Sequence, residues 1–239
     1  MTERDVELLR FVGRWAFCTI EQIGPVMGMS DQVVRRRIRA LRGHELLTAD
    51  RLLVGYPSLV SLTREGMRFV EISGPVIGPK LGQFHHDYLV VQWATEQMAK
   101  QPDWTFVTER EMRAADTVNQ QEVTHKEPLY AVERLAGKTT ERIYPDFLAI
   151  TPNGDHLAFE LEYSRKHGAR LEKLMAAYSF SERIKGVQYF CLPDAYSVVS
   201  RAANIVNEKM KETGRPQKIW VKEWAPATTR NLGGGEIDE

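Results

Sequence analysis

The 239-residue sequence has few cysteines, no net charge and no long apolar run. Its two cysteines, Cys18 and Cys191, lie far apart without metal-ligand spacing, and no secretory signal precedes them, so we expect a reducing, cytoplasmic location. No apolar run approaches the ~18 residues that a membrane span needs, so we expect no membrane partner. Because 32 basic residues balance 32 acidic ones, only the distribution of charge can indicate partners.

Several common catalytic patterns are missing as well. The six histidines show no His-hydrophobic-His spacing, and the adjacent His85 and His86 are interpreted as helix-cap or core residues. The sequence contains no Gly-x-Ser-x-Gly element, phosphate-binding glycine loop or zinc pattern. These absences disfavour serine-nucleophile, nucleotide-binding and zinc chemistry.

What is present indicates a folded protein of two domains. Hydrophobic residues make up 43% of the chain and charged residues 27%, a balance typical of globular proteins. Glycine and proline punctuate residues 74–80, which predicts a linker. We therefore expect a first domain at 1–73 that folds alone, a second domain at 81–226, and a disordered tail at 227–239.

The first domain is rich in arginine, with 11 arginines, no lysine and 9 acidic residues in 1–73. Ser30 is the expected N-cap of an arginine-rich helix whose Val34, Ile38 and Leu41 form a buried stripe. Thr19 is the expected N-cap of the helix before it. The predicted elements are helices at 5–15, 20–28 and 31–47 and short strands at 52–54 and 59–62.

Three helices followed by a hairpin resemble the winged helix-turn-helix family. In that family the third helix enters the major groove, with its N-terminal half on base edges and its arginines on phosphates, so double-stranded DNA is the expected partner. The alternative is a solvated basic helix in a protein-interaction domain. The candidate DNA-binding residues are Ser30, Gln32, Arg35, Arg36, Arg37 and Arg39, of which Gln32, Arg36 and Arg37 are expected to face outward opposite the apolar stripe.

The second domain is predicted to be a mixed sheet flanked by helices. Residues 116–142 are too long and polar for a tight connection, so they are interpreted as a substrate-facing loop or a disordered segment. The expected helices are 86–100, 167–185 and 196–213, and the expected strands are 104–108, 147–150, 156–163, 187–192 and 218–224.

The hairpin at 147–163 carries the candidate metal site. Side chains alternate along its second strand, so Leu157 and Phe159 are expected on a core face and Glu160 and Glu162 on the other face, roughly 7 Å apart. An antiparallel neighbour can bring Asp146 beside them. Three converging acids favour Mg²⁺ or Mn²⁺, which prefer hard oxygen ligands. The alternative is an ordinary solvated strand face.

These residues also resemble known families. Asp146 after Pro145, with Glu160 on the next strand, is similar to the PD-(D/E)xK restriction-endonuclease fold, although Glu162 stands where that family has lysine. A winged helix followed by this pattern resembles the MobC/TraX class of conjugative relaxases and the wider plasmid replication-relaxation proteins. The resemblance implies an α/β (α+β) chain, a winged helix-turn-helix followed by a restriction-endonuclease-like sheet, with site residues Asp146, Glu160, Glu162, Lys166 and Arg170.

The activity implied by the resemblance is metal-dependent nicking of one DNA strand at an origin of transfer in plasmid mobilisation. Asp146 and Glu160 would hold the metal, Glu162 would be a third ligand or the base, and Lys166 and Arg170 would neutralise the phosphate. The attacking group, a tyrosine or water, is left open. Implied partners are the duplex origin, the nicked single strand, a coupling protein or other relaxosome proteins, and a second copy of the chain. The alternative is a non-catalytic DNA-binding regulator or relaxosome accessory with a degenerate nuclease domain.

Overall fold

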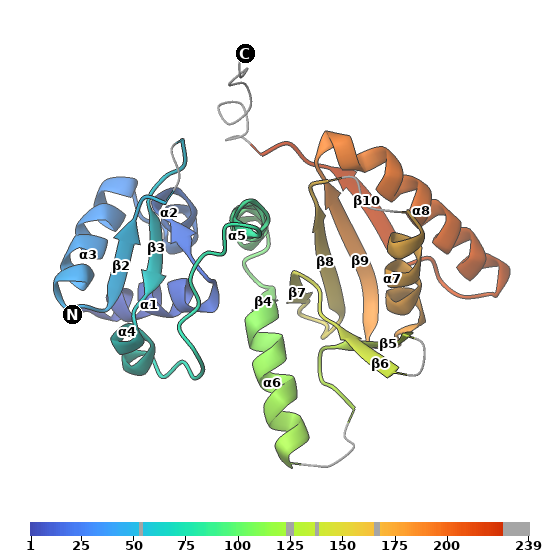
Figure 1. Cartoon of the computed structure of the whole chain (residues 1–239), viewed down its shortest axis with the longest axis horizontal. Helices are drawn as coiled ribbons and strands as arrows, with labels where there is room; N and C mark the ends of the chain where they lie inside the picture. Colours follow the sequence, from blue (N-terminus) through green and yellow to red (C-terminus); the bar gives the residue numbers. More distant parts are fainter. Residues whose placement is uncertain (53–54, 123–126, 137–138, 165–167, 227–239) are drawn as a thin grey trace. The chain divides into compact units, whose positions relative to one another are not determined.

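The computed structural model divides the chain into two compact units, which we call unit 1 (Met1–Pro102, with Pro226) and unit 2 (Asp103–Ala225) (Figure 1). Both contain helices and strands, which confirms the predicted mixed α and β class at that level. No helix in the described part of the chain is long and apolar enough to cross a membrane. The structure describes residues 1–52, 55–122, 127–136, 139–164 and 168–226, and the predicted tail at 227–239 lies outside them.

Unit 1 is built from helices around a small antiparallel sheet. Its three strands run in the order β1-β3-β2, so β3 lies in the centre. Helix α1 contacts β3 and helix α3 contacts β2. The elements are α1 (Glu3–Arg14), β1 (Cys18–Thr19), α2 (Ile20–Met27), α3 (Asp31–Gly43), β2 (Leu47–Asp50), β3 (Leu59–Leu62), α4 (Arg64–Phe69) and α5 (Phe84–Lys100).

Local signals set the ends of α2 and the buried face of α3, as predicted. Thr19 caps α2 by accepting a hydrogen bond from the Gln22 backbone N–H at 3.3 Å, and the Gln22 side chain accepts one in return from the Thr19 N–H. Gly28 ends α2 in the left-handed conformation, with φ of 59°. Helix α3 buries the predicted stripe of Val34, Ile38 and Leu41.

The first strand of the hairpin lies earlier than predicted. Strand β2 covers Leu47–Asp50 and pairs with β3 from Leu47 opposite Leu62 to Asp50 opposite Leu59, whereas the expected position was 52–54. Helix α3 ends at Gly43, and Glu45 follows with a positive φ of 59°. The buried Leu47, predicted to be the last residue of the helix, therefore belongs to the sheet; residues 53 and 54 lie outside the described part.

Helix α5 belongs to unit 1, which corrects the predicted boundary at 73–81. The Phe84 ring stacks on Phe17 with centroids 5.2 Å apart and meets Tyr56 edge-on at 4.8 Å. The Gln22 side chain donates a hydrogen bond of 3.0 Å to the Tyr88 carbonyl. The glycine and proline residues at 74–80 are therefore a connection within unit 1, because the aromatic side chains of α5 find their partners there.

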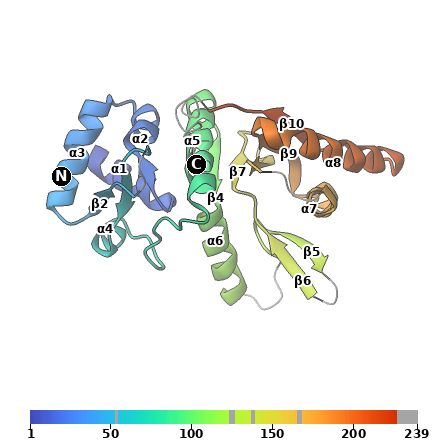
Figure 2. The same cartoon turned by 45° about the horizontal axis from the view of Figure 1, so that its top comes forward.

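Unit 2 contains a five-stranded mixed sheet in the order β10-β9-β8-β7-β4. Strands β8, β9 and β10 are parallel, whereas β7 runs antiparallel to β8 and to β4. Hairpin β5–β6 forms a separate two-stranded sheet (Figure 2). The elements are β4 (Thr105–Thr108), α6 (Glu109–Glu122), β5 (Val132–Ala136), β6 (Thr139–Ile143), β7 (Phe147–Ile150), β8 (His156–Glu162), α7 (Gly168–Phe180), β9 (Ile184–Cys191), α8 (Pro193–Glu212) and β10 (Ile219–Glu223).

Helices α7 and α8 pack together on one face of this sheet, where the core of unit 2 lies (Figure 1). Tyr178 of α7, Val199 of α8 and Ala158 of β8 are among its buried members. The other face carries a stacked pair of rings, Phe147 and Phe159, with centroids 4.9 Å apart. Strand β8, the middle strand of this mixed sheet, is therefore covered on both faces.

The described part of residues 116–142 is ordered, which corrects the expectation of a loop or a disordered segment. Helix α6 continues to Glu122, and hairpin β5–β6 follows. Asp116, which is 1% exposed, accepts hydrogen bonds of 2.6 to 3.0 Å from the backbone N–H groups of Leu129, Tyr130 and Ala131. The buried Asp116 carboxylate thus holds the segment that enters the hairpin, because three of its backbone N–H groups have this side chain as their hydrogen-bond acceptor.

Candidate functional site

The outer face of α3 is an exposed basic surface. The side chains of Arg35, Arg36 and Arg39 are exposed, as are those of Ser30 and Gln32. Arg35 forms an ion pair of 3.4 Å with Glu21, but both side chains are about half exposed, so the pair adds little to stability. Five of the six predicted DNA-binding residues therefore lie on an accessible surface.

Arg37 does not face outward as predicted, because α1 occupies its guanidinium. Its Nη1 donates hydrogen bonds to Asp5 at 2.6 Å and to the Thr2 hydroxyl at 3.0 Å, and its side chain is only 20% exposed. Burial alone would raise the pKa of Asp5, but hydrogen bonds from Thr2 and Arg37 outweigh it and lower that pKa. Arg37 joins α3 to the start of α1.

Two neighbouring arginines should therefore respond differently to truncation. We expect Arg37→Ala to lower the free energy of unfolding by about 1–2 kcal/mol at pH 7, since a charge-assisted pair is lost. Arg36→Ala should change it by less than about 0.5 kcal/mol. Because the folded pKa of Asp5 lies below its unfolded value of about 3.9, the Asp5 contribution is complete above about pH 4 and is lost as pH falls through the folded pKa.

Denaturant unfolding of both variants at pH 7 and at pH 3 checks this expectation. The loss of free energy of unfolding caused by Arg37→Ala should be smaller at pH 3 than at pH 7. DNA binding should distinguish the two variants in the opposite sense. The slope of the logarithm of DNA affinity against the logarithm of salt concentration should fall in magnitude by about 0.9 in Arg36→Ala and stay unchanged in Arg37→Ala. Equal losses of slope in the two variants would contradict the assignment of Arg37 to α1.

The two glutamates of β8 are buried, so the alternative of a solvated strand face is wrong. Glu160 is 8% exposed and Glu162 is 1% exposed. The hydroxyl of Tyr178 on α7 donates a hydrogen bond of 2.5 Å to Glu160 Oε1. Asp146 Oδ2 accepts a hydrogen bond of 2.7 Å from the backbone N–H of Leu161 on β8, which holds this carboxylate against the strand. A buried carboxylate oriented by its own donor is typical of functional sites.

Buried hydroxyls and a thiol respond electrostatically to these acids. Burial first, and then Glu160, raise the pKa of Tyr178 well above its ordinary value, so Tyr178 stays a protonated donor. Burial and then Glu160, Glu162 and Asp146 raise the pKa of Tyr189 in the same direction. Burial and Glu162 raise the pKa of Cys191 to about 12.

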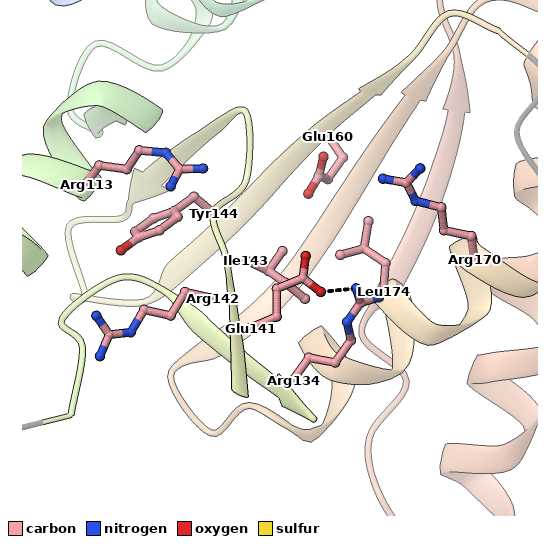
Figure 3. Close-up of a pocket in the computed structure, with 9 residues that line it drawn as sticks. All are labelled: Arg113, Arg134, Glu141, Arg142, Ile143, Tyr144, Glu160, Arg170 and Leu174. Atoms are coloured by element: carbon pink, nitrogen blue, oxygen red, sulfur yellow. Dashed lines mark hydrogen bonds and ion pairs between the residues drawn. The ribbon is translucent and has the colours of Figure 1, made fainter. Parts of the chain in front are cut away.

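Glu160 also lines a pocket of about 220 Å³ (Figure 3). The Arg170 side chain points from α7 toward Glu160, and Arg134 comes from β5 and pairs with Glu141 (Figure 3). The guanidinium of Arg113 lies 4.3 Å from the ring centroid of Tyr144. The Arg142 side chain points away from Glu160 (Figure 3). Such a lining favours an anion with several charged oxygens. The lining residues are Arg113, Arg134, Glu141, Arg142, Ile143, Tyr144, Glu160, Arg170 and Leu174.

The predicted site residues are only partly brought together. Glu160 and Arg170 line the pocket, whereas Asp146 and Glu162 are not among its lining residues, and Lys166 lies outside the described part. Sequence reasoning missed the remaining pocket arginines and Tyr178. Arg142 and Tyr144 lie within four residues of Asp146 in the sequence, so they could have been included in the predicted site. No local pattern predicts that Arg134 lines the same pocket as Glu160.

Asp146 and Glu160 offer carboxylate oxygens, the type of ligand that Mg²⁺ and Mn²⁺ prefer. Asp146 and Glu160 each have one oxygen oriented by a protein donor, and Mg²⁺ usually takes only one or two carboxylates with phosphate oxygens. Within the described ranges, no three His, Cys, Asp or Glu side chains are placed to hold a metal ion. The three-carboxylate site of Asp146, Glu160 and Glu162 therefore stays a prediction.

No protein-family model and no curated protein matches the chain. The function is therefore inferred from the pocket and from the surface of α3.

Proposed function

We propose that this protein is a metal-dependent DNA nickase that acts at one strand of a specific site, with the origin of transfer of a mobilisable plasmid as its substrate. The observation that carries the proposal is Glu160, a buried carboxylate oriented by Tyr178 in a pocket that Arg134 and Arg170 enter. Phosphoryl transfer needs positive groups around the phosphate and an acid that holds a cation. Two arginines and a buried carboxylate in one pocket support this assignment.

Unit 1 is proposed to bind the duplex as a winged helix-turn-helix domain. Helix α3 would enter the major groove, with Ser30 and Gln32 at its N-terminal end near base edges and Arg35, Arg36 and Arg39 on phosphates. Hairpin β2–β3 would be the wing. The exposed arginines of α3 support this assignment, because each can release a counterion from DNA.

The side chains of unit 2 would divide the work of cleavage between them. Arg170 would bind a phosphate oxygen and offset the charge that grows in the pentacoordinate state. Tyr178 would keep Glu160 turned toward the pocket, and Leu161 N–H would hold Asp146 against β8. Asp146 and Glu160 would hold the Mg²⁺ or Mn²⁺, which supplies positive charge at the scissile phosphate when it is bound.

A nicking assay on a library of candidate sites tests the proposal. Supercoiled plasmids carrying a library of inserts from the source replicon are incubated with the full-length protein and Mn²⁺, and the open circles are sequenced at their ends. Nicks at one position of one strand are expected with Mn²⁺ and not with chelator or with Glu160→Gln. The proposal would be overturned if the wild type and Glu160→Gln gave the same yield of open circles across the whole library.

A second candidate is a non-catalytic DNA-binding regulator or accessory protein. Glu162 stands where the PD-(D/E)xK pattern has lysine, and the described residues contain no group of three acids placed for a metal. In this case the same library would yield one bound sequence without a nick. Enrichment of bound plasmids, sequenced beside the nicked ones, separates the two candidates.

A further inference from the structure

Hairpin β5–β6 carries two cross-strand ion pairs at successive positions. Arg134 lies opposite Glu141 and forms an ion pair with it, and Glu133 lies opposite Arg142 at a distance of 3.5 Å. Because successive strand residues point to opposite faces, the two pairs lie on different faces of the hairpin. Arg134, Glu141 and Arg142 all line the pocket, but the Arg142 side chain points away from Glu160 (Figure 3).

Arg134 has hydrogen-bonding capacity that Glu141 does not use. Its side chain is 25% exposed, and its buried Nε has no hydrogen-bond partner among the described residues. A buried donor without an acceptor is costly, so the position favours a ligand that brings one. A guanidinium can bind two oxygens at once, which matches a phosphodiester better than one carboxylate does.

Arg170 is a second arginine of the same pocket. It enters the pocket from α7, and within the described part of the chain it has no ion pair. The pocket volume of about 220 Å³ is enough for a phosphate group, and both arginines line it. Glu141, by contrast, is 51% exposed, so its carboxylate can turn into solvent at little cost.

We propose that Arg134 and Arg170 form a subsite for a nucleic-acid phosphodiester, and that Glu141 occupies Arg134 until that phosphodiester displaces it. The inference rests on the proposed function in taking nucleic acid as the ligand of the pocket. Glu141 is then an internal competitor that weakens binding of arbitrary DNA. A DNA strand stays bound only when its other contacts with the protein, such as those of α3, contribute enough binding free energy to displace Glu141 from Arg134.

The hairpin provides a matched pair of variants for the test. Glu141→Gln and Glu133→Gln raise the net charge equally, on the same hairpin. The first frees Arg134, whereas the second frees Arg142, whose side chain points away from Glu160 (Figure 3). Binding of a fluorescent single-stranded oligonucleotide of arbitrary sequence is measured by anisotropy on the full-length protein, in chelator so that cleavage cannot contribute. We expect Glu141→Gln to tighten binding about fivefold and Glu133→Gln less than twofold.

Removal of the arginine should have the opposite effect. Arg134→Ala should weaken binding and lower the salt slope by about 0.7, the value for one phosphate contact on a single strand. Equal effects of the two glutamine variants, or an unchanged slope in Arg134→Ala, would overturn the inference. This binding assay measures no cleavage. If the predicted binding differences are found but the library assay shows no nicking, the result would contradict the proposed nickase and leave the phosphodiester subsite in place.

Discussion

A fragment ending at Gly74 is expected to lose the cooperative fold of unit 1, whereas a fragment ending at Pro102 is expected to keep it. The reason is α5, which starts at Phe84 and supplies ring partners to Phe17 and Tyr56. Its Tyr88 carbonyl also accepts the hydrogen bond from the buried Gln22 side chain. The shorter fragment would expose this aromatic cluster and leave a buried donor without its acceptor.

The magnitude follows from the side chains involved. Burying a large apolar side chain contributes about 1.5–3 kcal/mol, so losing Phe84 and Tyr88 alone removes about 3–6 kcal/mol. A whole domain is stable by about 5–15 kcal/mol, so this loss is comparable with the total. Circular dichroism melts of the two fragments measure the difference.

Point variants of the longer fragment provide the control. Phe84→Ala should lower the free energy of unfolding of this fragment by about 3–5 kcal/mol and lower its melting temperature accordingly. Lys100→Ala, at the exposed end of α5, should leave both nearly unchanged. A cooperative melt of the Gly74 fragment within a few degrees of the Pro102 fragment would show that α5 is dispensable for unit 1.

Neutralising either oriented carboxylate of unit 2 is expected to abolish nicking without loss of stability. Asp146→Asn and Glu160→Gln keep the shape of the side chain and an oxygen that can accept from Leu161 N–H or from Tyr178. What each removes is one of the negative charges that, after burial, raise the pKa of Tyr189. Stability should therefore stay constant or rise, because like charges no longer repel in a buried region.

The expected loss of nicking is at least about 100-fold, the usual cost of one missing electrostatic contact to a transition state. Duplex binding through α3 should be retained. Mg²⁺ or Mn²⁺ should raise the melting temperature of the wild type and not of the variants, because a ligand at 100 times its Kd stabilises the folded state by about 2.7 kcal/mol.

Tyr178→Phe is the matched variant for this comparison. It leaves the Glu160 charge in place and removes only the donor that orients it, so we expect a stability loss of about 1–3 kcal/mol and reduced nicking. Thermal melts of the wild type and all three variants, with metal and with chelator, decide the matter. A wild type that does not respond to metal, together with destabilised Asp146→Asn and Glu160→Gln, would favour the non-catalytic candidate.

Local chemistry in the sequence determined much of the secondary structure. The Thr19 cap and the left-handed Gly28 bound α2, and the apolar stripe at Val34 predicted the buried face of α3. The turn before β8 contains Gly154 with φ of 82°, as its Asn-Gly sequence predicts. Each of these signals acts between residues close in the chain, so the sequence alone was sufficient.

The tertiary structure decided the placement of elements and the fate of individual charges. Arg37 looked like its neighbour Arg36 until Asp5, 32 positions away, was brought beside it. The assignment of α5 to unit 1 depends on the contact between Phe17 and Phe84. Such contacts depend on which surfaces meet, and helical or strand periodicity carries no information about the partner of a face.

The candidate site shows the same division. The sequence indicated Glu160 and Arg170 from their pattern, but the burial of Glu160, its bond to Tyr178 and the approach of Arg134 arise only when α7 and hairpin β5–β6 close around β8. Whether a carboxylate is a solvated surface group or a buried, oriented one depends on the packing around it. That packing is set by long-range contacts, which the spacing of residues along one strand does not encode.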